Sequence, residues 1–435
     1  MAVCLPYRKS ITFKRKYKEF IHFAEIGQWT NVSWQLILWR CHFLCTRADC
    51  FSLSRQEFDN ANPSASTMDQ TTQFSTAFQD PDLCRQLLRT LQSIQTSPLT
   101  FMEVCGTHTV AIFRSGLHSL LPDTIEHLSG PGCPVCVTHD SEVAAYLKLA
   151  ERDNVIIATF GDLLRVPGPN GKTLKTAKAE GARVEIVYSP FDALTLAVDN
   201  PTETVVFLGI GFETTAPTVA ATVKTAQARG ISNLLVMSFH KLVPPALAAL
   251  VADNKTSVDA FLLPGHVSTV IGLEPYRFLA SEYGVPGVVT GFEPADILQA
   301  LIYVARMRAN GEADIVNAYT RAVASEGNPQ AVAIMNEVFD HGPALWRGIG
   351  GIDGSGLIFS NDYAEFDALR ALDLTIEETP PLKGCQCGDV LKGIIKPNQC
   401  RLFGTACTPA KPVGPCMVST EGSCAAYYKY RLELS

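Results

Sequence analysis

Six cysteines lie within forty residues near the C-terminal end, at successive spacings of 2, 13, 7, 9 and 8 residues. They are Cys385, Cys387, Cys400, Cys407, Cys416 and Cys424. A hydrophobic core does not need so many thiols so close together, so we expect them to bind a metal, one another, or both. Zinc ribbons usually have two Cys-x₂-Cys pairs about 15–20 residues apart, and this segment has none. Iron–sulfur clusters take four thiolates at more variable spacings, which leaves one pair for a redox-active disulfide. The spacing therefore favours a cluster over zinc, with plain disulfides as the third alternative.

A second group of thiols occurs in the run Gly130-Pro131-Gly132-Cys133-Pro134-Val135-Cys136. This is a Cys-x-x-Cys pair in a tight turn rich in proline and glycine. Such a pair can close a disulfide, bind a metal or exchange thiols. We predict one of these activities rather than two inert buried thiols.

A third candidate is Cys105, which follows a short apolar run and is expected to begin a helix towards His118. The dipole at a helix N-terminus favours the thiolate, so the position predicts a lowered pKa for this thiol. His108 follows three residues later, within reach on the first turn. The combination suits a nucleophile or a soft-metal ligand. Because this site and the Cys-x-x-Cys turn both precede the strong strand–helix units, they could share one face of the first domain.

The elements that must position these thiols alternate between short apolar runs and helical segments from about residue 100 to 310. The predicted strands are 155–160, 184–188, 205–210, 234–239, 261–263 and 285–290. The predicted helices between them include 141–152, 217–229, 244–251 and 294–308, several with proline in the first turn. This alternation is typical of an α/β fold with parallel sheets covered by helices. Polar loops follow three of the strands, at 211–215, 238–241 and 264–267, which predicts a cleft at the carboxyl ends of the strands.

We predict two similar α/β domains followed by a cysteine-rich domain. The first domain is 68–198 and carries Cys105 and the Cys-x-x-Cys turn, and the second is 199–340 and ends in helices. The segment 341–435 is predicted to contain a glycine-rich hinge at 342–356 and then the metal or redox centre. Residues 1–67 hold three of the four tryptophans and four cysteines. We interpret them as an upstream extension, with Met68 as the start of the working protein; the alternative is a targeting or docking arm.

Composition excludes several classes of protein. A net charge of −7 and a pI near 5.8 argue against a nucleic-acid binder. The sequence has no apolar run of membrane-spanning length and no secretory pattern at its start. Gly209-Ile210-Gly211 is not a dinucleotide motif, because Thr214 stands where the third glycine is required. The long cysteine-free stretch between Cys136 and Cys385 is typical of a cytoplasmic protein that uses thiols for metal or redox work.

Taken together, these motifs resemble the HypD family of hydrogenase maturation factors. The resemblance rests on 102–109, 130–136, 211–217, 264–267 and 384–430, and it runs from about Met68 to the C-terminus. The last block, GCQCGDVLKGIIKPNQCRLFGTACTPAKPVGPCMVSTEGSCAAYYKY, is highly specific.

The resemblance implies a redox-active assembly scaffold rather than a conventional turnover enzyme. HypD proteins help to build the Fe(CN)₂CO group of [NiFe] hydrogenases together with a small HypC-type chaperone, with the iron held between the two proteins. Cyanide comes from HypE, which carries it as a thiocyanate, and HypF acts upstream. Cys105 matches the iron ligand, with His108 close by, and Cys133 and Cys136 match a redox pair at the same metal site. In the tail, the resemblance assigns the [4Fe–4S] ligands to Cys385, Cys400, Cys407 and Cys424, and the adjacent disulfide to Cys387 and Cys416.

Two other functions remain open from the residues. One is a stand-alone thiol–disulfide oxidoreductase of the ferredoxin-linked kind. The other is a zinc-stabilised interaction module with no redox role.

Overall fold

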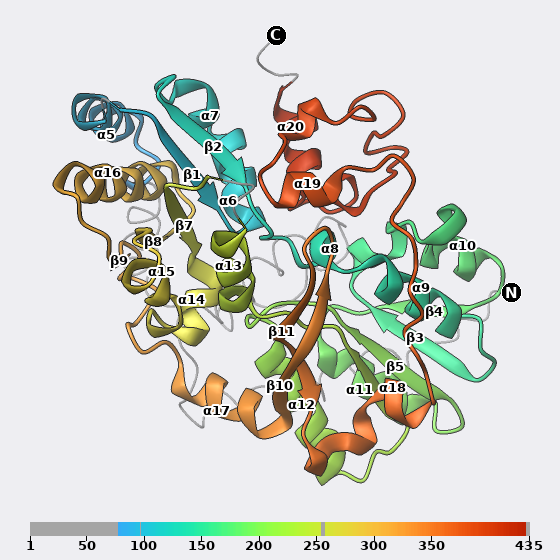
Figure 1. The fold of residues 1–435 in the computed structure, drawn as a ribbon. Helices are drawn as coiled ribbons and strands as arrows, with labels where there is room; N and C mark the ends of the chain where they lie inside the picture. Colours follow the sequence, from blue (N-terminus) through green and yellow to red (C-terminus); the bar gives the residue numbers. More distant parts are fainter. Residues whose placement is uncertain (1–76, 96, 254–256, 432–435) are drawn as a thin grey trace, which may run out of the picture. The chain divides into compact units, whose positions relative to one another are not determined.

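The computed structural model describes residues 77–95, 97–253 and 257–431, which form an α/β protein with two parallel sheets and one antiparallel hairpin (Figure 1). The predicted extension 1–67 and the predicted start at Met68 lie outside the described residues. Within the described ranges, no helix is long and apolar enough to cross a membrane.

The first sheet has the strand order β2-β1-β7-β8-β9, with all neighbours parallel. Its strands are β1 (Leu99–Glu103), β2 (Ile125–Ser129), β7 (Ala260–Pro264), β8 (Gly287–Thr290) and β9 (Ile315–Asn317). Helices α5 (Pro81–Ile94) and α16 (Pro294–Asn310) lie side by side and form one hydrophobic core with β1, β7 and β8. Helices α13 (Val243–Ala252) and α14 (Gly265–Ile271) contribute to the core that contains the alternate residues of the same strands. Strands β7 and β8 are buried along their whole length, which explains why they are largely apolar.

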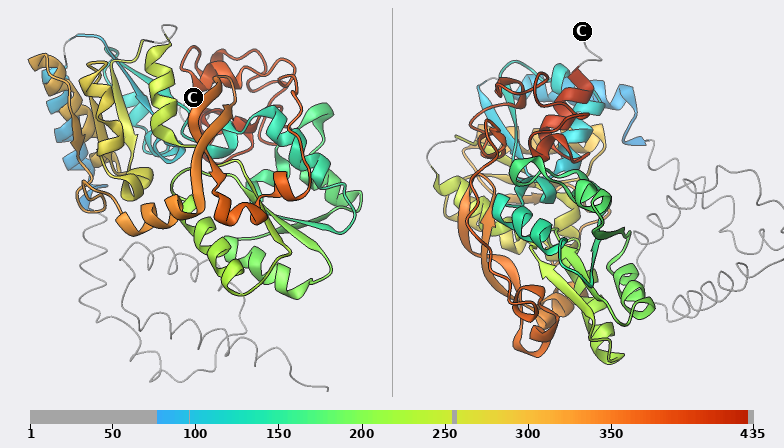
Figure 2. Two further views of the ribbon diagram at one scale, coloured as in Figure 1. Left: turned by 60° about the horizontal axis from the view of Figure 1, so that its bottom comes forward. Right: turned by 90° about the vertical axis from the view of Figure 1, so that its right-hand side faces the viewer.

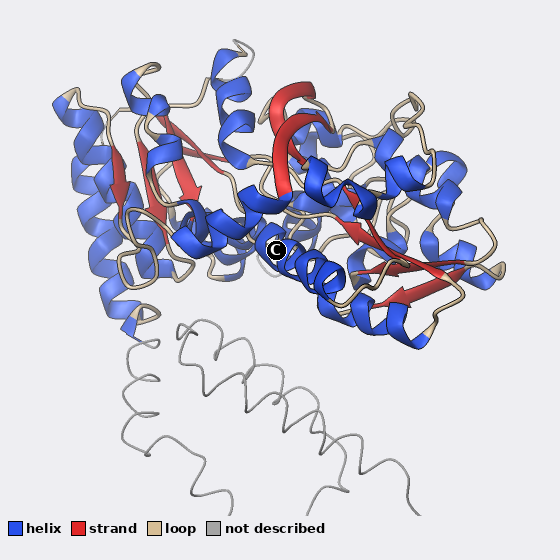
Figure 3. Ribbon diagram, turned by 90° about the horizontal axis from the view of Figure 1, so that it is seen from below, coloured by secondary structure: helices blue, strands red, loops and turns tan. Residues whose placement is uncertain are grey.

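The second sheet has the order β4-β3-β5-β6, again with all neighbours parallel. Its strands are β3 (Val155–Thr159), β4 (Arg183–Ile186), β5 (Thr204–Gly209) and β6 (Leu234–Ser238). Helices α9 (Asp140–Leu149) and α10 (Leu174–Ala179) share one core with it, and α11 (Pro190–Asp199) and α12 (Ala216–Ala228) share the other. Figure 3 shows this sheet and the first as separate groups of strands, each flanked by helices. The predicted α/β class, the six predicted strands and the four predicted helices are confirmed, with ends that differ by at most three residues.

The predicted domain boundary between residues 198 and 199 is wrong. Strand β5 pairs with β3 through Val155↔Thr204, so both sides of that boundary belong to one sheet. Strand β1 pairs with β7 through Phe101↔Ala260, so the whole second sheet is inserted between two strands of the first. The strand–helix alternation is locally the same in both sheets, so it does not mark where the chain leaves one sheet and enters the other.

The glycine-rich segment 342–356 is not a hinge but most of an antiparallel hairpin, formed by β10 (Phe339–Trp346) and β11 (Gly350–Phe359). Gly348 at the turn has a φ of 77°, a conformation that favours glycine. Gly342 and Gly356 face each other across the two strands. Of the helices predicted at the end of the second domain, the structure has α17 (Pro329–Val338), whereas residues Ile315–Asn317 form strand β9. The hairpin also bridges to the connection between the two sheets, through Thr138↔Trp346, and to the loop after β6, through Lys241↔Gly356.

The cysteine-rich tail consists of short elements: α19 (Cys387–Leu391), η5 (Pro397–Gln399), η6 (Pro415–Met417) and α20 (Ser423–Arg431). It is drawn in red in Figures 1 and 2, where it lies beside both sheet regions. Thr107 near the end of β1 donates a hydrogen bond to Glu421 of the tail at 2.7 Å. Ser419 of the tail donates one to Asp162 of the second sheet region at 3.1 Å. The tail therefore contacts loops at the carboxyl ends of strands from both sheets.

Candidate metal and thiol site

The loops that carry the predicted chemistry lie where the connections of each sheet change direction. In the first sheet, β1 connects to β2 on one side and β7 connects to β8 on the other side. The switch point of this sheet therefore lies between β1 and β7. Cys105 follows β1 directly at this position, where ligands bind in open parallel sheets. Glu213 follows β5 at the equivalent point of the second sheet. Tyr276 interacts electrostatically with both Glu213 and Cys105, so the two switch points face the same region.

Cys105 is the N-cap residue of helix α6 (Gly106–Arg114), and its thiol is buried. Burial raises the pKa of this thiol to about 12, and the carboxylate of Glu421 adds to the effect, although the backbone N–H groups of His108 and Thr107 act to lower it. The predicted lowering of the pKa is therefore wrong. The helix N-terminus acts as expected, but desolvation and the nearby acids outweigh it. The helix predicted to continue towards His118 ends at Arg114, and a separate turn, α7 (Leu117–Leu120), follows.

The His108 ring lies against the loop after β8, where it contacts Phe292. Its Nε2 donates a hydrogen bond to the carbonyl of Gly291 at 2.9 Å, and its Nδ1 is buried with no partner among the described residues. Burial lowers the pKa of His108 to about 4, so the imidazole is neutral at pH 7. A neutral imidazole with one nitrogen fixed by a backbone carbonyl and a free lone pair on the other is the arrangement found in metal-binding histidines.

The Cys133–Cys136 turn packs directly against the Cys105 loop. An ideal Cβ on Gly132 would lie 2.2 Å from the backbone nitrogen of Cys105, so only glycine fits there. Gly106 donates a backbone hydrogen bond to the Gly132 carbonyl at 3.0 Å. The Cys136 N–H lies 3.2 Å from the Cys133 sulfur, at the start of α8 (Pro134–Val137). The prediction that the two motifs share one face is therefore confirmed.

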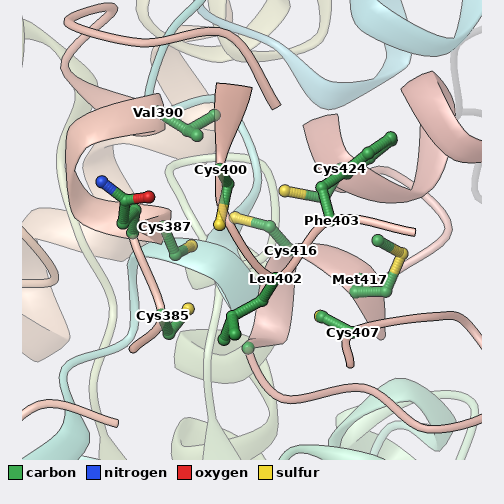
Figure 4. A pocket seen from close by; sticks show the side chains of 12 residues that line it. Cys385, Cys387, Val390, Cys400, Leu402, Phe403, Cys407, Cys416, Met417 and Cys424 are labelled. Carbon is green, nitrogen blue, oxygen red and sulfur yellow. The ribbon is translucent and has the colours of Figure 1, made fainter. Parts of the chain in front are cut away.

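All six tail cysteines line a single pocket (Figure 4). The Cys416 thiol interacts with those of Cys136, Cys387 and Cys424, and the Cys387 thiol also interacts with Cys385. The described cysteines are all free thiols, so the predicted Cys387–Cys416 disulfide appears here as a contact between two thiols. A line of neighbouring thiols within one buried cluster thus runs from the Cys-x-x-Cys turn into the pocket.

Like Cys387 and Cys416, the four cysteines that the resemblance assigns to the cluster lie on the pocket wall: Cys385, Cys400, Cys407 and Cys424. Among the described residues, no three His, Cys, Asp or Glu side chains converge as a single metal ion would require. A cluster differs in that each thiolate binds a different iron, so its ligands surround a volume rather than a point. The N–H of Val413 donates to the Cys407 sulfur at 3.3 Å, as is common around cluster sulfurs. An ideal Cβ on Gly414 would lie 2.4 Å from the Cys385 sulfur, so this glycine leaves room beside that thiol.

Sequence reasoning missed several charged residues that surround the thiols. Glu103 is buried at the end of β1 and accepts a hydrogen bond from the N–H of Cys105 at 3.0 Å. Glu421, between two tail cysteines, acts on Cys105 from a distant part of the chain. Arg347 forms a buried ion pair with Asp140. Glu103 and Glu421 could have been found from the sequence, because each is a carboxylate inside a motif of apolar residues and cysteines. Nothing in the glycine-rich segment distinguishes Arg347.

Comparison with known proteins gives a family and several close relatives. The HypD family model, described as the hydrogenase formation hypA family, matches residues 82–431. The chain is 45% identical over 339 residues to hydrogenase maturation factor HypD of Escherichia coli, which covers 78% of this chain and 91% of that protein. It is 44% identical over 337 residues to the HypD of Cupriavidus necator, covering 76% and 89%. It is 43% identical over 372 residues to the HypD of Rhodobacter capsulatus, covering 82% and 98%.

Proposed function

The chain belongs to the HypD family of hydrogenase maturation factors and acts in hydrogenase maturation, and from that premise we propose that it is the scaffold on which the Fe(CN)₂CO group is assembled. The observation that carries the proposal is the line of thiols that joins the Cys133–Cys136 turn to the tail pocket, beside Cys105. The proposed partners are a HypC-type chaperone that shares the iron and a HypE-type protein that delivers cyanide as a thiocyanate, with HypF upstream.

In this proposal the iron is cargo, bound by the Cys105 sulfur and by Nδ1 of His108. Cyanide and carbonyl are strong-field ligands of low-spin Fe(II), for which a thiolate is a suitable soft anchor. Because the pKa of Cys105 is about 12, the thiol is protonated at neutral pH before iron arrives, so binding releases one proton. The buried position of both side chains keeps water away from the bound iron.

Cyanide transfer needs two electrons, which Cys133 and Cys136 can supply as a dithiol. The balanced step is R–S–C≡N plus two thiols giving R–SH, HCN and one disulfide. One thiol proton goes to the sulfur of the carrier and the other leaves with cyanide, which loses it on binding iron. The new disulfide lies between Cys133 and Cys136, whose turn already places the Cys136 N–H 3.2 Å from the Cys133 sulfur.

The Cys133–Cys136 disulfide is then reduced by exchange with Cys387 and Cys416. Contact between Cys136 and Cys416 supports this route, because thiol–disulfide exchange needs direct approach of the attacking sulfur. A [4Fe–4S] cluster bound by Cys385, Cys400, Cys407 and Cys424 would supply single electrons to the second pair. Repeated cycling between thiol and disulfide suits a reducing compartment, so we place this work in the cytoplasm.

The test is a Cys105→Ala variant purified anaerobically with its small chaperone. The infrared bands of iron-bound CN and CO are expected to disappear, whereas the brown colour and about four iron and four sulfide per chain remain. Cys84→Ala is the matched control, since Cys84 lies on α5 against a different core. Loss of the cluster in the Cys105→Ala variant would show that the ligands are misassigned.

The stand-alone thiol–disulfide oxidoreductase is the second candidate, because the line of thiols would serve it equally well. Wild-type protein that holds the cluster but shows no CN or CO bands with its chaperone would favour this function. Protein that contains zinc and no iron or sulfide would instead indicate the zinc-stabilised module.

A further inference from the structure

The tip of the β10–β11 hairpin carries one arginine into the protein, next to the Cys-x-x-Cys turn. Arg347 is 5% exposed. Its backbone N–H donates to the carbonyl of Val137 at 2.9 Å, and its Nε donates to that of Thr138 at 3.0 Å. Its Nη1 pairs with the carboxylate of Asp140, the first residue of α9. The guanidinium is therefore fixed to the segment that directly follows Cys136.

The other side of the guanidinium faces the tail thiols. Nη2 is buried and has no hydrogen-bond partner in the described protein. Arg347 lines one pocket together with Cys385 and Cys387, and its charge acts on both of these thiols. The next residue, Gly348, packs so closely on Gly388 that an ideal Cβ would lie 2.1 Å from the Cα of Gly388. The hairpin tip thus holds a positive charge at a set place between the two groups of thiols.

We propose that Arg347 is the internal counter-ion of the tail redox centre and that it favours the reduced state. An arginine keeps its charge at any pH at which the protein is folded. Uptake of one electron by a cluster that four thiolates already make anionic adds one negative charge, with no bond made or broken. A nearby buried cation stabilises that charge more strongly than water-screened surface groups can. Asp140 holds the guanidinium and cancels part of its charge.

The proposal makes the two members of the ion pair act in opposite directions. Removing the cation should make the cluster harder to reduce, and removing the carboxylate should make it easier. A residue pair that only held the hairpin in place would give the same effect from either side, because both variants break the same salt bridge. Arg347 is therefore a positioning residue, and comparing the two variants separates the effect of its charge from the effect of its packing.

The experiment is a potentiometric titration of the full-length protein, with the reduced cluster followed by electron paramagnetic resonance. Arg347→Gln is expected to lower the ratio of reduced to oxidised cluster at a fixed potential about tenfold, or about 59 mV for a one-electron couple. Asp140→Asn is expected to raise this ratio. Arg347→Lys keeps the positive charge and is expected to retain most of the wild-type ratio. Arg165→Gln is the control, since Arg165 is exposed and bonds to the tail only through the Val418 carbonyl at 3.0 Å.

Equal shifts in the same direction for Arg347→Gln and Asp140→Asn, or no shift in either, would overturn the proposal. If Arg347→Gln does not fold, Asp140→Asn alone tests the proposal, because only a rise in the ratio of reduced to oxidised cluster agrees with a charge effect. The proposal rests on the cluster assigned under the proposed function, and the two can fail separately. Wild-type protein without iron and sulfide refutes the cluster, whereas a cluster with unchanged potentials refutes only the role of Arg347.

Discussion

Replacing Glu213 by glutamine is expected to change how the stability of the protein depends on pH. Glu213 is 1% exposed at the switch point of the second sheet. Its Oε1 accepts a hydrogen bond from the N–H of Val243 at 2.8 Å, while Oε2 is buried and has no partner in the part of the chain that the structure describes. Burial raises the pKa of this carboxyl from 4.5 to about 7, because one hydrogen bond does not compensate the loss of water around a charge.

The sign follows from proton binding. Between pH 4.5 and about 7 the folded state holds a proton on Glu213 that the unfolded chain has already lost. The contribution of this group to stability is therefore fully present below about pH 4.5 and is lost as pH rises through 7. With about 1.4 kcal/mol for each pH unit, the loss amounts to about 3 kcal/mol.

Glutamine keeps the same shape without a titrating proton. The free energy of unfolding of Glu213→Gln, compared with wild type, should therefore rise by about 3 kcal/mol between pH 4.5 and 8. Urea denaturation at several pH values, under anaerobic conditions, measures this difference. Glu282→Gln, an exposed carboxyl, is the control and should give a curve parallel to wild type. A curve for Glu213→Gln that is also parallel to wild type would refute the argument.

Two further substitutions test the packing around the site and the first sheet. Gly132→Ala places a Cβ 2.2 Å from the Cys105 backbone, so we expect thermal unfolding to show a free energy of unfolding lower by about 1–3 kcal/mol. We also expect the CN and CO bands to be lost while the cluster is retained. Wild-type stability with intact bands would contradict this. Arg321→Met leaves the fully buried carboxylate of Asp296 without its cation and should cost about 3 kcal/mol in denaturant unfolding. Lys148→Ala, which removes an exposed ion pair, should cost less than about 1 kcal/mol, and equal losses in the two variants would argue against burial as the cause.

Local elements of the fold were predictable because their signals are local. The strand Thr204–Gly209 is a run of apolar residues buried along almost its whole length, and Pro294 marks the start of α16. The hairpin was missed because its glycines indicate a loop in sequence, whereas in the structure they allow a tight turn and close strand packing. The assignment of strands to sheets failed for a different reason, since pairing of Phe101 with Ala260 leaves no mark in either segment.

In the candidate site, too, the features with local sequence signals were predictable and those that depend on long-range contacts were not. The tail cysteines could be grouped in advance because they lie close together in sequence, and they line one pocket. The pKa of Cys105 could not be predicted from its helix position, because its largest causes are burial and a carboxylate at Glu421. The contact between Cys136 and Cys416 and the pairing of Arg347 with Asp140 join residues that only the folded chain brings together.

The insertion of one sheet within the other has a consequence for synthesis. All four strands of the second sheet lie between residues 155 and 238, so this unit can fold while the ribosome is still making β7. The loop after β1 that carries Cys105 is made earlier but must wait for its neighbours: strand β7, the Gly291 carbonyl that fixes His108, and finally Glu421. A nascent chain therefore exposes Cys105 long before its surroundings exist, and the loop acquires its native environment only after the last part of the protein has been translated.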